Sequence, residues 1–216
     1  MREYEHTVND RPNLAPIDKY DQGSLDRRLK TSENFQPEKP LAGSSLNLPE
    51  VQGFEQTGLT NSAEIKRYLG ETFPPEHVDH ASLPSVVYHD VYKPAQDGNF
   101  LGMTRYNQET GVSHIEIYRQ QQEGNSNPAD MTYTLAHEVG HNAYWVSGES
   151  VQRSWDKLSV ASASDEYVTG YARTGVREDF AESYATYVLD PDLLSEVSQK
   201  KYDFMRNFIF SGREYR

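Results

Sequence analysis

Residues 127–148 read NPADMTYTLAHEVGHNAYWVSG, and this stretch decides the fold of the surrounding chain. Asn127 is a favourable N-cap residue, Pro128 suits the first helical position, and Gly148 suits a helix end. Apolar residues recur every four positions from Met131 to Val139, which is the spacing of one helical face. The stretch therefore predicts a helix that buries one face and leaves another for polar side chains.

The centre of this helix carries His137-Glu138-Val139-Gly140-His141. Residues i and i+4 lie on the same side of a helix, so both imidazoles can bind one ion, while Glu138 stands about 100° further round. The chain has no cysteine, so any metal must be held by histidine or carboxylate groups. The pattern predicts two zinc ligands, His137 and His141, with Glu138 as a general base.

A catalytic zinc site needs a third protein ligand. Glu178 opens a segment with helical periodicity, and Glu182 follows one turn later on the same face. We expect Glu178 to bind the metal and Glu182 to accept a hydrogen bond from a ligating histidine. Asp165 and Glu166 are a competing source of the third ligand, and Asp179 is a further alternative.

The rest of the chain predicts an α+β layout. A helix is expected to start after Asn61, which has a glutamate three residues later, and to stop at Gly70. Three β-like runs follow, Val86–Tyr88, Phe100–Tyr106 and Val112–Tyr118, and the last two should form a hairpin. We expect a small, mostly antiparallel sheet packed on the helix with the two histidines, followed by a helical C-terminal part.

The length of 216 residues suits one domain with an appendage. Residues 1–60 contain five of the eleven prolines and show no sustained periodicity, which predicts an extended or partly disordered arm. Residues 61–216 are expected to form the metal-binding domain.

Composition narrows the possible partners. The chain has 21 Lys and Arg against 33 Asp and Glu, a formal charge of -12, which disfavours nucleic acid. No apolar run approaches the roughly 18 residues of a membrane span, and the start lacks the apolar region of a secretory signal. We expect a peptide or protein substrate and a monomer.

The motif that ends at His141, followed by Tyr171, Glu178 and Glu182, resembles the zinc peptidase domain of anthrax lethal factor and the bacterial Pro-Pro endopeptidases. The resemblance extends over about residues 61–216. It implies a zincin-like fold, one zinc ion per chain, Glu178 as third ligand, Glu182 orienting a histidine, and Tyr171 stabilising an oxyanion. It also implies a peptide lying against an edge strand, for which we expect Val112–Tyr118.

Three functions follow from these patterns. The first is a zinc-dependent endopeptidase with Glu138 as general base, secreted or delivered into a target cell as a toxin or effector. The second is a cytoplasmic regulatory zinc peptidase that cleaves a repressor. The third is a metal-stabilised module that binds an extended peptide without cutting it.

Overall fold

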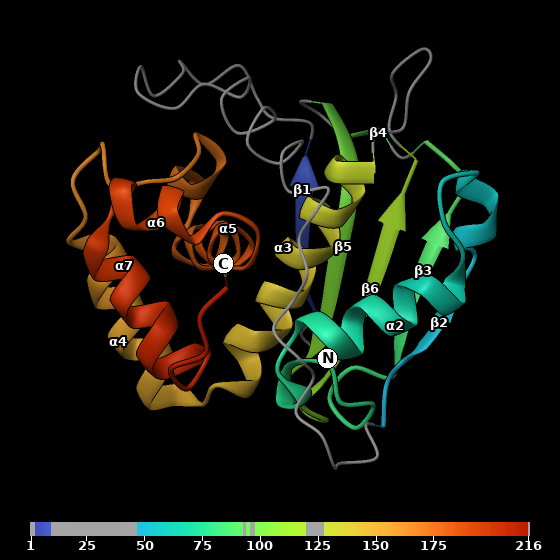
Figure 1. Ribbon diagram of the computed structural model, residues 1–216, viewed down its shortest axis with the longest axis horizontal. Helices are drawn as coiled ribbons and strands as arrows, with labels where there is room; N and C mark the ends of the chain where they lie inside the picture. The colour runs from blue at the N-terminus through green and yellow to red at the C-terminus, as the bar shows by residue number, and fades with distance from the viewer. Residues whose placement is uncertain (1–2, 10–46, 93, 96–97, 120–127, 216) are drawn as a thin grey trace.

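The structure is a computed structural model, which describes residues 3–9, 47–92, 94–95, 98–119 and 128–215 (Figure 1). The strands are β1 (Glu3–Asn9), β2 (Glu50–Gln52), β3 (Ser85–His89), β4 (Pro94–Ala95), β5 (Gly98–Asn107) and β6 (Val112–Tyr118). The α-helices are α2 (Ser62–Thr72), α3 (Pro128–Val146), α4 (Glu149–Val160), α5 (Val176–Leu189), α6 (Pro191–Val197) and α7 (Gln199–Phe204). Short 3₁₀ turns are η2 (Phe54–Thr57), η3 (Pro75–His77) and η4 (Tyr171–Thr174), and a π-helical turn, η5 (Met205–Ile209), follows α7.

The two predicted helix starts are observed. The Asn61 side chain caps α2 by accepting a hydrogen bond from the Glu64 amide at 3.0 Å. Helix α3 begins at Pro128, while its predicted N-cap, Asn127, lies outside the described residues. The predicted stop of α2 at Gly70 is wrong, because the helix continues to Thr72 and the chain becomes extended only before Pro74.

The sheet is mixed: three of its pairings are antiparallel, as expected for most of the sheet, and two are parallel. Its strand order is β1-β5-β6-β3-β2, with β4 paired to β5. Strands β5 and β6 form the predicted antiparallel hairpin, but β3 pairs with β6 in parallel and β2 pairs with β3 in parallel. The alternation of polar and apolar residues places a strand in a sheet without giving the direction of its neighbours, so the two parallel pairings could not be read from it.

The expected peptide-binding strand, Val112–Tyr118, is not an edge strand. This segment is β6, and it lies between β5 and β3. The predicted alternation holds as far as Ile117, because Ser113, Ile115 and Ile117 are buried and His114 is exposed, but the last residue, Tyr118, is also buried. Both edges of β6 are therefore paired within the sheet, so β6 has no open edge for a peptide.

Two strands come from the first sixty residues of the chain. β2 adds to the edge of β3, and β1 pairs antiparallel with β5. Residues 10–46 lie outside the described residues. The division into an arm over 1–60 and a domain over 61–216 stays a prediction.

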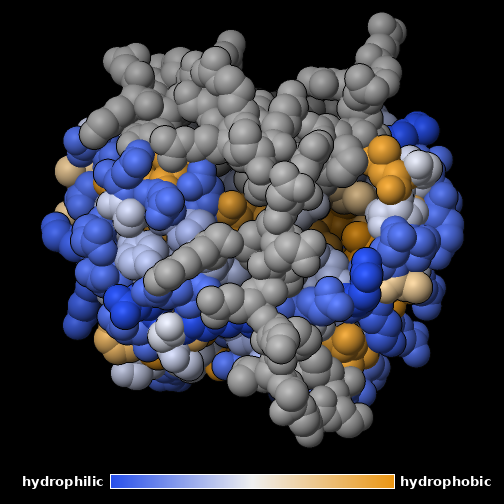
Figure 2. Space-filling view, in the orientation of Figure 1, coloured by the Kyte–Doolittle hydropathy of each residue, from blue (hydrophilic) through white to orange (hydrophobic). Residues whose placement is uncertain are grey.

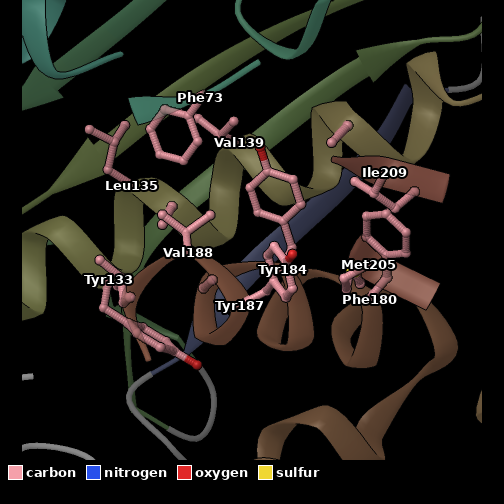
Figure 3. Close-up of a cluster of buried hydrophobic side chains, with 14 of the residues drawn as sticks. Phe73, Tyr133, Leu135, Val139, Phe180, Tyr184, Tyr187, Val188, Met205 and Ile209 are labelled. Carbon is pink, nitrogen blue, oxygen red and sulfur yellow. The ribbon is translucent and has the colours of Figure 1, made fainter. Parts of the chain in front are cut away.

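The helical part is built around α5. Helices α2 and α3 cover the sheet, while α4 to α7 gather beyond α3 (Figure 1). Every side chain from Asp179 to Leu189 of α5 is buried. Figure 3 shows the apolar part of this interior, to which α3 contributes Leu135 and Val139 and α5 contributes Phe180, Tyr184, Tyr187 and Val188.

A glycine allows α3 and α5 to pack closely. A Cβ atom at Gly140 would lie 3.1 Å from the Cα of Ala181 and 3.1 Å from the Cβ of Tyr184. Contacts this short are tighter than ordinary van der Waals packing. The absence of a side chain at position 140 therefore sets the approach of the two helices.

The face seen in Figure 2 is mostly hydrophilic where described residues form it. Large apolar side chains are exposed only singly among the described residues, at Leu59, Val91, Val160 and Phe208. In the described part of the chain, no helix combines the length and apolar character that a membrane crossing requires.

Candidate metal centre

Helix α3 directs both motif histidines to one point. The Nε2 atoms of His137 and His141 lie 3.1 Å apart, and both side chains are buried. The i and i+4 spacing accounts for this arrangement, because one helical turn separates the two residues. The predicted pair of imidazoles therefore faces a common position.

Helix α5 brings a carboxylate to the same point. The Oε2 atom of Glu178 lies 3.2 Å from Nε2 of His137 and 3.4 Å from Nε2 of His141. Donor atoms held about 2.0–2.1 Å from a tetrahedral zinc are about 3.3–3.4 Å from one another. These three side chains form a His₂Glu group that can hold a metal ion, and the observed spacings fit one.

The electrostatics of the group favour a cation. Burial lowers the pKa of His137, but hydrogen bonds and charge from Glu178 and Glu182 outweigh it and raise the pKa to about 10. In the absence of a metal, a proton on His137 supplies the positive charge that the carboxylates favour. A bound divalent ion would supply it instead, after His137 loses that proton.

Glu182 fixes the orientation of His137. Its Oε1 atom lies 2.8 Å from Nδ1 of His137, while its Oε2 atom accepts hydrogen bonds from Tyr133 at 2.7 Å and Thr169 at 2.5 Å. A carboxylate held in this way accepts a hydrogen bond from Nδ1–H, which leaves the Nε2 lone pair directed at the ion position. The geometry matches the predicted relation between Glu182 and a motif histidine.

Glu138 lies between α3 and β5. The Thr104 hydroxyl lies 2.6 Å from Oε2 of Glu138, and the other oxygen, Oε1, has no hydrogen-bond partner among the described residues. A Cβ atom at Gly102 would stand 2.6 Å from Oε1, so the glycine provides the space for this carboxylate. Burial raises the pKa of Glu138 to about 8, despite lowering contributions from His137 and Thr104.

Tyr171 comes from η4, immediately before α5. Its ring centroid lies 5.9 Å from that of His137, and the side chain is buried. Burial raises the pKa of Tyr171, and the charges of Glu178, Glu138 and Glu182 add to the effect. The phenol therefore keeps its proton at ordinary pH and can act as a hydrogen-bond donor.

The competing sources of a third ligand lie elsewhere. Asp165 is exposed, and Glu166 accepts a hydrogen bond from the amide of Ala163 at 2.8 Å. Asp179 faces Lys201 at 2.7 Å. Among the described residues, His137, His141 and Glu178 are the group of metal-binding side chains with suitable spacing.

Four residues around the centre were not predicted from the sequence: Gly102, Thr104, Tyr133 and Thr169. Tyr133 stands one turn before His137 on α3, so helical spacing was a usable signal for it. The other three come from β5 and from the loop before η4. No local pattern connects those segments to the motif.

Comparisons with protein-family models, with curated proteins and with solved structures give no match for this chain. The arrangement of the His₂Glu group is consistent with a zincin-type site on its own geometry.

Proposed function

We propose that this protein is a zinc-dependent endopeptidase. The observation that carries the proposal is the convergence of three donor atoms at 3.1 to 3.4 Å with the Glu138 carboxylate on the same helical turn. Two imidazoles and one carboxylate are the ligand set of several zinc peptidases. The same conclusion is supported by the sequence order. The motif ending at His141 is followed by Tyr171 and then by Glu178 and Glu182, an order that resembles that of lethal factor and the Pro-Pro endopeptidases.

Zinc, when held by His137, His141 and Glu178, supplies Lewis acidity that polarises a carbonyl group and makes water more acidic. The residues of the chain do the remaining work. Glu138 takes a proton from the attacking water through its Oε1 atom, which no described residue engages in a hydrogen bond, while Thr104 holds the other oxygen. Glu138 then returns the proton to the leaving amine.

Tyr171 is the proposed donor to the oxyanion that develops on the peptide carbonyl. Its raised pKa keeps the hydroxyl protonated, and its ring lies beside His137. A donor that is already oriented stabilises developing charge without reorganising. Glu182 keeps His137 in the orientation that binds the metal.

Secretion or delivery into a target cell as a toxin or effector remains a proposal that rests on the family resemblance alone. The zincin-like fold assignment and the choice of a peptide or protein as substrate rest on that resemblance together with the ligand set of the metal centre.

The decisive experiment is digestion of a proteome-derived peptide library, read by mass spectrometry, with the zinc-loaded chain. The matched control is Glu138→Gln, which keeps the size of the side chain and removes the base. We expect cleavage by the wild type, loss of cleavage with a chelator, and loss in the control at unchanged zinc content. A wild type that binds zinc and peptide without cutting would instead identify a binding module.

A further inference from the structure

The backbone of β5 is paired on both sides. On one side it forms the hairpin with β6, and on the other it pairs antiparallel with β1 over Glu3–Asn9. Figure 1 shows β1, in blue, alongside β5. Without β1, β5 would present a row of free backbone N–H and C=O groups along its outer edge.

This edge belongs to the strand that contacts the proposed general base. Gly102 and Thr104 of β5 both adjoin Glu138. In the β1–β5 register, Val8 stands opposite Gly102 and His6 stands opposite Thr104. The β1 backbone therefore runs about 4.8 Å, one strand spacing, from the two β5 residues that adjoin Glu138.

An endopeptidase has to hold an extended backbone close to its general base. Strand addition to an exposed sheet edge is a recurrent way to do so, because main-chain hydrogen bonds bind peptides of different sequence. The β6 side of β5 is closed by the hairpin, so the outer edge of β5 is the edge beside Glu138 that a peptide could join. In this structure β1 fills that edge.

We infer that β1 is a self-inhibitory strand, which occupies the peptide-binding edge of β5 and has to leave before a substrate can bind. This inference rests on the proposed peptidase function. β1 is suited to the role because it pairs with β5 alone among the strands, at the end of the strand order. Its release would leave the pairing of β5, β6, β3 and β2 unchanged.

A competing strand has a defined kinetic signature. If β1 leaves only a fraction of the molecules open, the apparent affinity for substrate falls to that fraction of its value for the open form. The molecules that have bound substrate turn over at the same rate. β1 therefore raises KM and leaves kcat unchanged. A strand that only supported the fold would not raise KM while leaving kcat unchanged.

The test compares the zinc-loaded full chain with its His6→Pro/Thr7→Pro variant. Consecutive residues of a strand direct their N–H groups to opposite edges, so either His6 or Thr7 directs its N–H group to β5. Whichever of the two does so, one of the prolines removes that hydrogen bond. Thr7→Val is the matched control, because valine keeps the N–H group and favours strands.

We expect amide hydrogen exchange in β5 to rise at least about tenfold in the proline variant, and KM for a peptide from the library digest to fall at least about tenfold. The kcat should stay constant, and Thr7→Val should behave as the wild type. A synthetic peptide with the sequence of residues 3–9, EYEHTVN, should inhibit the proline variant competitively.

Equal exchange rates and equal KM values in the two chains would overturn the inference and leave the peptidase proposal intact. Loss of folded structure in the proline variant, measured by circular dichroism, would also overturn it, because β1 would then be a structural strand. If neither chain cleaves any peptide, the peptidase proposal falls. Tighter binding of labelled EYEHTVN to the proline variant than to the wild type would still identify β1 as the occupant of the β5 edge.

Discussion

The Nζ atom of Lys201 lies 2.7 Å from Oδ1 of Asp179, and both side chains are completely buried. This pair joins α7 to the first turn of α5, one residue after the candidate ligand Glu178. Burial raises the pKa of Asp179 and lowers that of Lys201, and the contact between them opposes both shifts. Each charge depends on the other to remain in the interior.

Removing one member of this pair should destabilise the fold. We expect Lys201→Met to lower the free energy of unfolding by about 3–5 kcal/mol, because it leaves Asp179 as a buried charge without its partner. The double variant Lys201→Met/Asp179→Asn should lose less than the sum of the two single variants. Urea denaturation of the four proteins measures this, and strict additivity would show that the contact contributes no coupling.

The two glutamates of α5 should differ in their effect on metal binding. Glu178→Ala should abolish stoichiometric zinc, because it removes one of three donors. Glu182→Gln should weaken zinc binding by about 10–100-fold, because it alters only the orientation of His137. Competition titration with a chromophoric chelator measures both affinities. Equal affinities in the two variants would contradict these assignments.

Tyr171→Phe should lower kcat by about 10²–10³ with little change in KM, because the hydroxyl acts on the developing oxyanion. Zinc content and thermal stability should remain close to those of the wild type. Tyr187→Phe is the matched control, because its hydroxyl donates to the Arg213 carbonyl away from the metal centre. Equal loss of kcat in both variants would point to a packing defect rather than to oxyanion stabilisation.

Gly102→Ala should impair activity without removing zinc. The new Cβ atom would stand 2.6 Å from Oε1 and 2.8 Å from Cγ of Glu138, so the carboxylate has to move. Gly175→Ala is the control, because a Cβ atom there meets no atom within 4 Å. Peptidase assays combined with zinc analysis would show the effect, and full activity in Gly102→Ala would argue against this position for the Glu138 carboxylate.

The metal-free chain should lose stability as the pH rises from about 6.5 to 10. In the folded state the pKa of His137 is raised to about 10, so the folded chain holds a proton that the unfolded chain releases near pH 6.5. The raised pKa of Glu138, about 8, acts in the same direction. Zinc should oppose this loss, because it replaces the His137 proton. Thermal unfolding at several pH values, with and without zinc, should therefore show a stabilisation by zinc that increases with pH.

The helices of the site could be predicted because their signals are local. The motif of α3 and the pair Glu178 and Glu182 of α5 each follow the helical repeat, which reads directly from the sequence. The structure brings these two segments together at the predicted positions. Glu178 was preferred over Asp165 and Glu166 because its segment has helical periodicity, and the structure agrees, since Asp165 is exposed and Glu166 accepts a hydrogen bond from Ala163.

The sheet was harder to predict for a physical reason. Parallel pairing of β3 with β6 joins segments separated along the chain by β4 and β5, and the alternation within β6 is the same for a parallel or an antiparallel neighbour. The roles of Gly102 and Thr104 depend on which strand lies against α3. Sequence reasoning therefore identified the groups proposed for the chemistry but missed the strand that positions Glu138.

Packing constrains Gly140, one of the two positions that the His-Glu-x-x-His motif leaves open. A Cβ atom there would lie 3.1 Å from Ala181 and from Tyr184, so α5 would have to give way by a few tenths of an ångström next to the turn that carries Glu178. The residue at this position of the motif therefore bears on how closely the helix that supplies Glu178 packs against the helix that supplies the two histidines. In this protein, the close packing of α3 against α5 depends on Gly140, whose side chain is a single hydrogen atom.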